Sequence, residues 1–149
     1  MKPTKLVAAI AALAIACVAL ASVAGAAPTA GTKISAKLTA KAEVPPQTFK
    51  STKGTGSFTG TLTGRKLVWK LTWAKLSGPA NAAHIHLAKA GKAGNVAVPL
   101  CAGATCKSGV HGTVTLKASV LKAIKTGGAY VNVHTAKNPN GENRGQIAP

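Results

Sequence analysis

Acidic and aromatic residues are both scarce in this chain. Its 149 residues include 2 acidic and 19 basic side chains, which gives a formal net charge of +17, and aromatic residues make up only 3%. The two acids are Glu43 and Glu142, so catalysis by a pair of carboxylates would require these two to converge. No G-x-S-x-G motif and no other nucleophile–base pattern is present. The sequence therefore predicts no catalytic residue of these kinds.

The excess of basic residues predicts attraction to polyanions. The lysines are spread along the whole chain, and no dense basic cluster, helix-turn-helix pattern or RNA-binding motif accompanies them. We therefore expect no specific nucleic-acid partner. An unidentified protein or an anionic polymer of the cell envelope is the expected partner of a monomeric protein.

The first 26 residues have the pattern of a secretory signal peptide. Lys2 and Lys5 precede a long apolar run, and the run ends in the small residues of positions 24–26, before Pro28. We expect residues 27–36 to form a linker and the start of the first strand, and residues 37–149 to form one domain. The protein is then secreted, periplasmic or held at the cell surface, with no transmembrane segment after the signal. An uncleaved membrane anchor is the alternative, because the apolar run is long enough to span a bilayer.

Two cysteines follow the signal, Cys101 and Cys106, in the stretch CAGATC. In an exported chain, an even pair this close together predicts a disulfide. A metal site is the weaker alternative, because no second cysteine pair is present to complete a tetrahedral set.

Alternation of apolar and polar residues predicts most of the secondary structure. In KLVWKLTWAKL, residues 66–76, leucines and tryptophans occupy every second position, as in a strand with one buried face. The same period recurs near Ile34 and in AYVNVHT, and turn-forming residues separate these runs. We expect a hairpin across Gly64 and Arg65, a turn over residues 138–145 and a last short strand over residues 145–149. Residues 117–128 instead have helical spacing and end in two glycines. We expect an all-β fold, an antiparallel β-sandwich of about 7–8 strands with one short helix.

Several of these segments, in this order, resemble the CHRD domain, a module named from chordin. The matching segments are LTAKAEVPP, GTGSFTGTL, LVWKLTWAKLSGP, AAHIH, VPL and GGAYVNVHTAKNPNGENRGQI. The resemblance implies an immunoglobulin-like sandwich. The short single-domain architecture suggests the bacterial, exported form of the module. It implies no defined biochemical activity. Members of this family usually carry more acidic residues than this chain does.

Three of the four histidines are candidate metal ligands. His84 and His86 project from the same face of one expected strand, and His134 lies on another. Three neutral imidazoles suit copper or zinc. Glu142 could complete such a site or orient one of its rings. The alternative is a structural cluster of hydrogen-bonded histidines that needs no metal.

The two glutamates both lie inside the family-like segments, which suggests that each has a fixed partner. Arg144 lies two residues after Glu142 and is one candidate. We expect Glu43, Glu142, Arg144 and Asn132 to form a structural polar cluster near the histidines.

The sequence leaves two functions open. One is a non-catalytic binding or structural module of the cell envelope or extracellular space. The other is a copper- or zinc-binding protein, and a redox activity like that of superoxide dismutase is its one enzymatic form.

Overall fold

Strands with one buried face make up most of the molecule. The computed structural model describes residues 30–46 and 53–149. The strands are β1 (Thr32–Thr39), β2 (Thr55–Thr63), β3 (Lys66–Ala74), β4 (Ala80–His86), β5 (Val96–Ala102), β6 (Val110–Thr115), β7 (Tyr130–Thr135) and β8 (Asn143–Gln146). A single α-helix, α1 (Ala118–Lys125), and two 3-10 turns, Ala40–Ala42 and Gly103–Thr105, complete the described elements. The all-β class with one short helix is confirmed.

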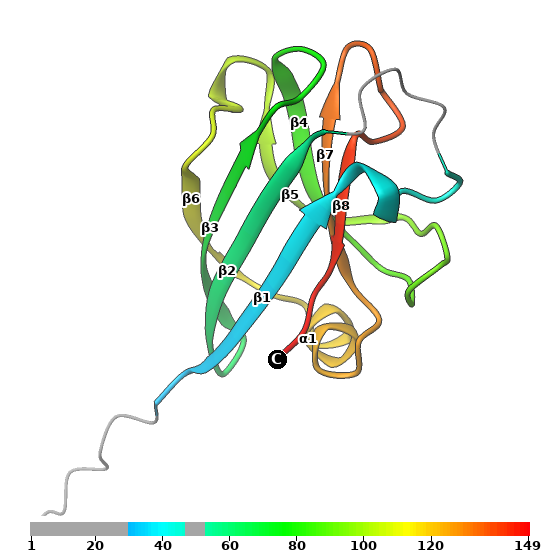
Figure 1. Ribbon diagram of the computed structural model, residues 1–149. Helices are drawn as coiled ribbons and strands as arrows, with labels where there is room; N and C mark the ends of the chain where they lie inside the picture. The colour runs from blue at the N-terminus through cyan, green and yellow to red at the C-terminus, as the bar shows by residue number, and fades with distance from the viewer. Residues whose placement is uncertain (1–29, 47–52) are drawn as a thin grey trace, which may run out of the picture.

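The described strands pair as one antiparallel sheet in the order β5-β4-β7-β8-β1-β2-β3-β6. The sheet folds over so that β4, β5 and β7 lie behind β1, β2 and β3, and the edge strands β5 and β6 contact each other (Figure 1). Two separate sheets, as in a sandwich, were expected. Instead β1 and β8 join the two halves through the pair Thr39–Arg144, and the result is close to a barrel.

The core lies between the two halves of the sheet. In β3, Leu67, Trp69 and Leu71 are buried and the intervening residues are exposed or half-buried, as the alternation predicts. β2 and β3 join through the turn at Gly64 and Arg65, where Gly64 has a φ of 58°. The expected hairpin is therefore present.

The helix ends as its two glycines predict. The amide of Gly128 donates to the carbonyl of Ala123 at 2.7 Å, and the amide of Gly127 donates to Ile124. Gly127 has a φ of 67°, which completes a Schellman motif. The helix buries Val120 and Ile124 against the end of the core.

The last strand differs from the expectation. Residues 138–145 read as a turn and residues 145–149 as a strand, but β8 spans Asn143–Gln146. It pairs antiparallel with β7, with Asn143 opposite Val133 at one end and Gln146 opposite Tyr130 at the other. The strand therefore begins inside the expected turn and brings Arg144 into the sheet.

The expected signal peptide, residues 1–26, lies outside the described residues. Across residues 30–46 and 53–149, no helix is both long and apolar enough to cross a membrane.

Candidate metal centre

The three histidines lie on the outer face of the β4–β7 pair. Across the two strands, Ala82 is paired with His134, His84 with Asn132, and His86 with Tyr130. The alternate residues of both strands, among them Ile85 and Val133, are buried in the apolar core. Because side chains alternate across a strand, the polar residues project away from that core.

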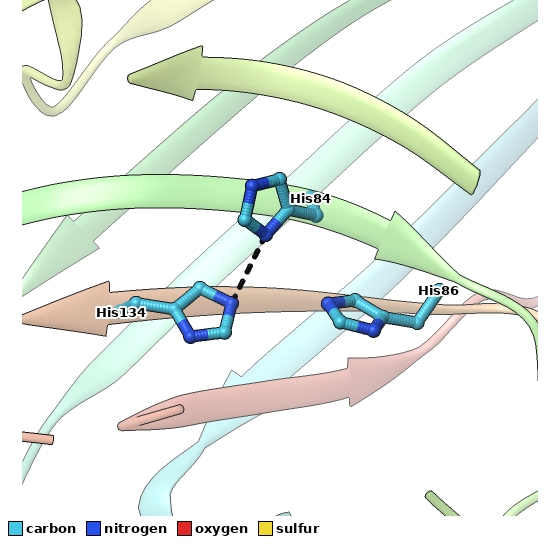
Figure 2. A group of neighbouring side chains, drawn as sticks. All are labelled: His84, His86 and His134. Carbon is cyan, nitrogen blue, oxygen red and sulfur yellow. Dashed lines mark hydrogen bonds between the residues drawn. The ribbon is translucent and has the colours of Figure 1, made fainter. Parts of the chain in front are cut away.

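The three imidazoles converge on one point. One nitrogen from each of His84, His86 and His134 lies within 4.8 Å of the other two. The Nδ1 of His84 lies 3.2 Å from the Nε2 of His134, and Figure 2 shows the His86 ring approaching the same space along the strand. The convergence that the sequence left open is therefore present.

Backbone carbonyls fix the protonation of two rings. The Nδ1 of His86 lies 2.9 Å from the carbonyl oxygen of Gly94, and the Nδ1 of His134 lies 3.0 Å from that of Pro139. A carbonyl only accepts a hydrogen bond, so each Nδ1 carries a hydrogen. In the neutral ring, Nε2 then keeps a free lone pair.

Burial favours the neutral form of all three rings. It lowers the pKa of His84 to about 4, with a further contribution from the neighbouring His134 and His86. Burial also lowers the pKa of His86 and of His134, and it outweighs the carbonyl hydrogen bonds that raise them. At neutral pH the site therefore presents unprotonated imidazoles, the form that binds metals.

Tyr130 supports the site from one side. Its ring stacks on the His86 ring with centroids 4.9 Å apart, and its hydroxyl is hydrogen-bonded to Gly94. The guanidinium carbon of Arg144 lies 3.5 Å from the centroid of the Tyr130 ring. Arg144 also donates to the carbonyl of Lys92 at 2.7 Å. These contacts hold the loop between β4 and β5 against the histidines.

Glu43 and Asn132 form a buried pair beside this support. The Nδ2 of Asn132 donates to Glu43 at 3.2 Å. Burial raises the pKa of Glu43 to about 7, although Asn132 and the charge of Arg144 both lower it. Glu43 therefore interacts with Asn132 through a hydrogen bond and with Arg144 through its charge.

Glu142 lies in a neighbouring hydrogen-bond network, and its charge contributes to the raised pKa of Glu43. Its carboxylate accepts hydrogen bonds from Ser77, Thr135 and Asn138. Burial raises the pKa of Glu142, but these hydrogen bonds outweigh burial and lower it overall. Arg144 is therefore not its hydrogen-bonding partner, and Glu142 contributes no atom to the histidine cluster. Sequence reasoning had missed Ser77, Thr135 and Asn138.

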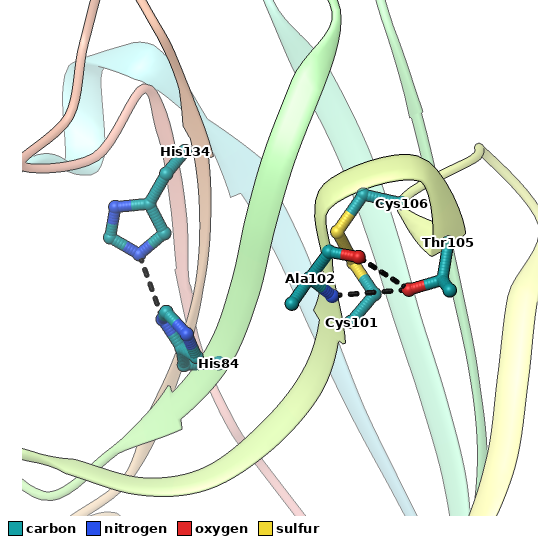
Figure 3. Close-up of a disulfide and its surroundings, with 6 residues drawn as sticks. All are labelled: His84, Cys101, Ala102, Thr105, Cys106 and His134. Atoms are coloured by element: carbon teal, nitrogen blue, oxygen red, sulfur yellow. Dashed lines mark hydrogen bonds between the residues drawn. A yellow bond between two sulfur atoms is a disulfide. The ribbon is translucent and has the colours of Figure 1, made fainter.

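Cys101 and Cys106 form the expected disulfide, with 5.1 Å between their Cα atoms. Cys101 pairs with Ala83, whose side chain faces the core, whereas His84 faces outward. Figure 3 shows β4 passing between the disulfide and the His84–His134 pair. The sulfur atoms therefore lie apart from the cluster.

Comparison with known proteins gives one match. The model of the CHRD domain family matches residues 34–147. No curated protein and no solved structure matches significantly.

Proposed function

The chain belongs to the CHRD domain family, and from that premise we propose that it is a metal-binding module. His84, His86 and His134 hold one copper or zinc ion. The observation that carries the proposal is the convergence of the three rings, one nitrogen of each lying within 4.8 Å of the other two. The Nε2 of His86 is also buried and has no hydrogen-bond partner among the described residues. A buried acceptor without a partner calls for an explanation, and a bound ion is one.

A purely structural histidine cluster explains this atom less well. His84 and His134 can satisfy each other, since the Nδ1 of His84 can donate to the Nε2 of His134. His86 receives no such donor, although its Nε2 shares the space between the rings. A metal ion would use all three lone pairs at once.

The ring spacing fits a small transition-metal ion. Zinc–nitrogen bonds are about 2.0–2.1 Å, so two nitrogens on a tetrahedral ion lie about 3.3 Å apart. The 3.2 Å between His84 and His134 matches this separation. The 4.8 Å limit for the whole set is larger, so binding would draw at least one ring inward.

The ligand set favours copper or zinc. It contains imidazoles and neither a thiolate nor a carboxylate, which disfavours magnesium and calcium. Three protein ligands leave a fourth position for water or another small ligand. His84 is half-buried, whereas the other two rings are buried, so the open position would lie on its side.

We place this module outside the cytoplasm, as a non-catalytic binding or structural protein of the envelope or extracellular space. The signal-peptide pattern and the Cys101–Cys106 disulfide support this location. A dismutase-like activity would need bound copper together with the open position. It is therefore secondary to metal binding.

Competition against a chromophoric chelator tests the proposal on protein purified without a histidine tag. We expect wild-type protein to bind one equivalent of copper or zinc, and His86→Ala and His134→Ala each to weaken binding at least tenfold. His111→Ala is the matched control, because His111 is exposed on β6, away from the cluster. Equal affinity in all four proteins would rule out the cluster as the site.

A further inference from the structure

The surface of the described chain is basic without opposing side-chain carboxylates. Both acids, Glu43 and Glu142, are buried, with exposed fractions of 3% and 0%. The lysines are mostly exposed, so charge repulsion acts between copies of the chain, and attraction acts toward anions. Charge alone does not define an anion-binding site, which also requires a surface shaped to receive the anion.

A hollow of about 700 Å³ lies on the outer face of β1, β2, β3 and β6. One row of outward residues crosses it, with Lys33 beside Thr61, Thr61 beside Val68, and Val68 beside Thr113. The Nζ of Lys33 donates to the hydroxyl of Thr61 at 3.0 Å. Val68 is 49% exposed and is the apolar member of this row.

A second row lies two residues along the strands. Ser35 pairs with Thr59, Thr59 with Lys70, and Lys70 with His111. All four residues are exposed and line the same hollow, and no acidic side chain lines it. The two rows together present cations separated by hydroxyl groups.

We propose that this hollow binds a linear acidic polysaccharide. Lys33 and Lys70 would pair with carboxylate or sulfate groups, and the serine and threonine hydroxyls would bond to sugar hydroxyls. From strand spacing and rise per residue, the Cα atoms of Lys33 and Lys70 are about 12 Å apart, which spreads the two cations along a polymer. This site is independent of the metal centre, which uses β4 and β7.

Other anionic partners fit the hollow less well. Single-stranded nucleic acids bind on exposed aromatic side chains, and Trp69, the aromatic residue that lines the hollow, is buried with only 7% of its surface exposed. A membrane-binding surface inserts protruding apolar residues into the bilayer, whereas here the face is hollowed and its exposed apolar residues are Val68 and Pro149. A flexible polyanionic chain can enter the hollow, and its charge complements the lysines.

Isothermal titration with oligomers of polygalacturonate tests the proposal on the purified protein in the presence of a chelator. We compare K33Q/K70Q with K122Q/K125Q. Both variants lose two positive charges, but Lys122 and Lys125 are exposed residues of α1 outside the hollow. We expect the first variant to weaken binding about tenfold. The slope of log affinity against log salt concentration should fall by about two, because each lysine contact releases about one counterion. The control should bind within about twofold of wild type.

Three results would overturn the proposal. Equal weakening in the two variants would mean that net charge alone attracts the polymer. If the wild-type protein does not bind polygalacturonate, an acidic polysaccharide is not the ligand of this hollow. Tighter binding to vesicles of anionic phospholipid than to the polymer, lost in K33Q/K70Q, would assign the face to a membrane. Circular dichroism melts of both variants check that each is folded.

Discussion

The Nδ1 of His84 lies 3.2 Å from the Nε2 of His134, although 50 residues separate them along the chain. The pairing of β4 with β7 creates this contact, because it places Ala82 opposite His134 and leaves His84 one pair further along the same face. Two imidazole nitrogens this close either share a hydrogen or share a metal ion. The third ring, His86, favours the ion.

Gly94 is expected to control metal affinity without touching the metal. A Cβ at this position would lie 2.0 Å from the carbonyl oxygen of Leu87, so Gly94→Ala must shift the loop that hydrogen-bonds to His86. Loss of such an orienting bond typically weakens metal binding about 10–100-fold. Chelator competition measures the change. Gly78→Ala is the control, since nothing lies within 4 Å of its added Cβ, and equal affinities would contradict the orienting role.

Glu142 is expected to stabilise the turn before β8. Replacing it with alanine leaves Thr135 and Asn138 without their shared acceptor in a buried position. Hydrogen bonds to a charged group contribute about 1.5–3 kcal/mol each, so Glu142→Ala should lower the free energy of unfolding by about 3 kcal/mol or more. Urea denaturation measures this loss. A change below about 1 kcal/mol would show that the network is dispensable.

Glu43 should make stability depend on pH in an unusual direction. Its pKa is about 7 in the folded protein against 4.5 for an exposed glutamate. The folded state therefore binds this proton more tightly than the unfolded state does. The resulting contribution to the free energy of unfolding is complete below pH 4.5 and is lost as the pH rises through about 7. The melting temperature of Glu43→Gln, taken as a difference from that of the wild-type protein, should therefore increase as the pH rises from 5 to 8. A constant difference across that range would contradict a raised pKa.

The disulfide should matter for stability and not for metal binding. A bridge with a sequence separation of 5 closes a short loop, for which chain entropy gives about 2 kcal/mol. Cys101→Ser/Cys106→Ser should lose about that much stability in urea denaturation and keep its copper or zinc affinity. A loss of affinity in the folded variant would mean that sulfur belongs to the site.

The strands were predictable because their pattern is local. Alternation in β3 and the glycines after α1 encode their own structure, and the observed elements follow them closely. β8 was misplaced because its residues, Asn143–Gln146, lack that alternation and follow a turn-rich stretch. Its position comes from pairing with β7 and not from its own sequence.

The candidate site was predictable only in part. Residue type and spacing pointed to His84, His86 and His134, but their convergence depends on the register between β4 and β7. The hydrogen bonds of Glu142 were not predictable from spacing. Ser77 lies 65 residues away, and the nearer Arg144 contacts Tyr130 and Lys92 instead. Likewise, no local pattern indicated that Gly94 and Pro139 would present carbonyls to two of the rings.

X-ray absorption at the metal edge of protein loaded with one equivalent of copper or zinc tests the central claim most directly. We predict a first shell of nitrogen or oxygen at about 2.0–2.1 Å with the multiple-scattering pattern of three imidazoles. In the His86→Ala variant that pattern should fall to two imidazoles. A sulfur shell near 2.3 Å, or an imidazole signal unchanged by His86→Ala, would contradict a metal centre built from His84, His86 and His134.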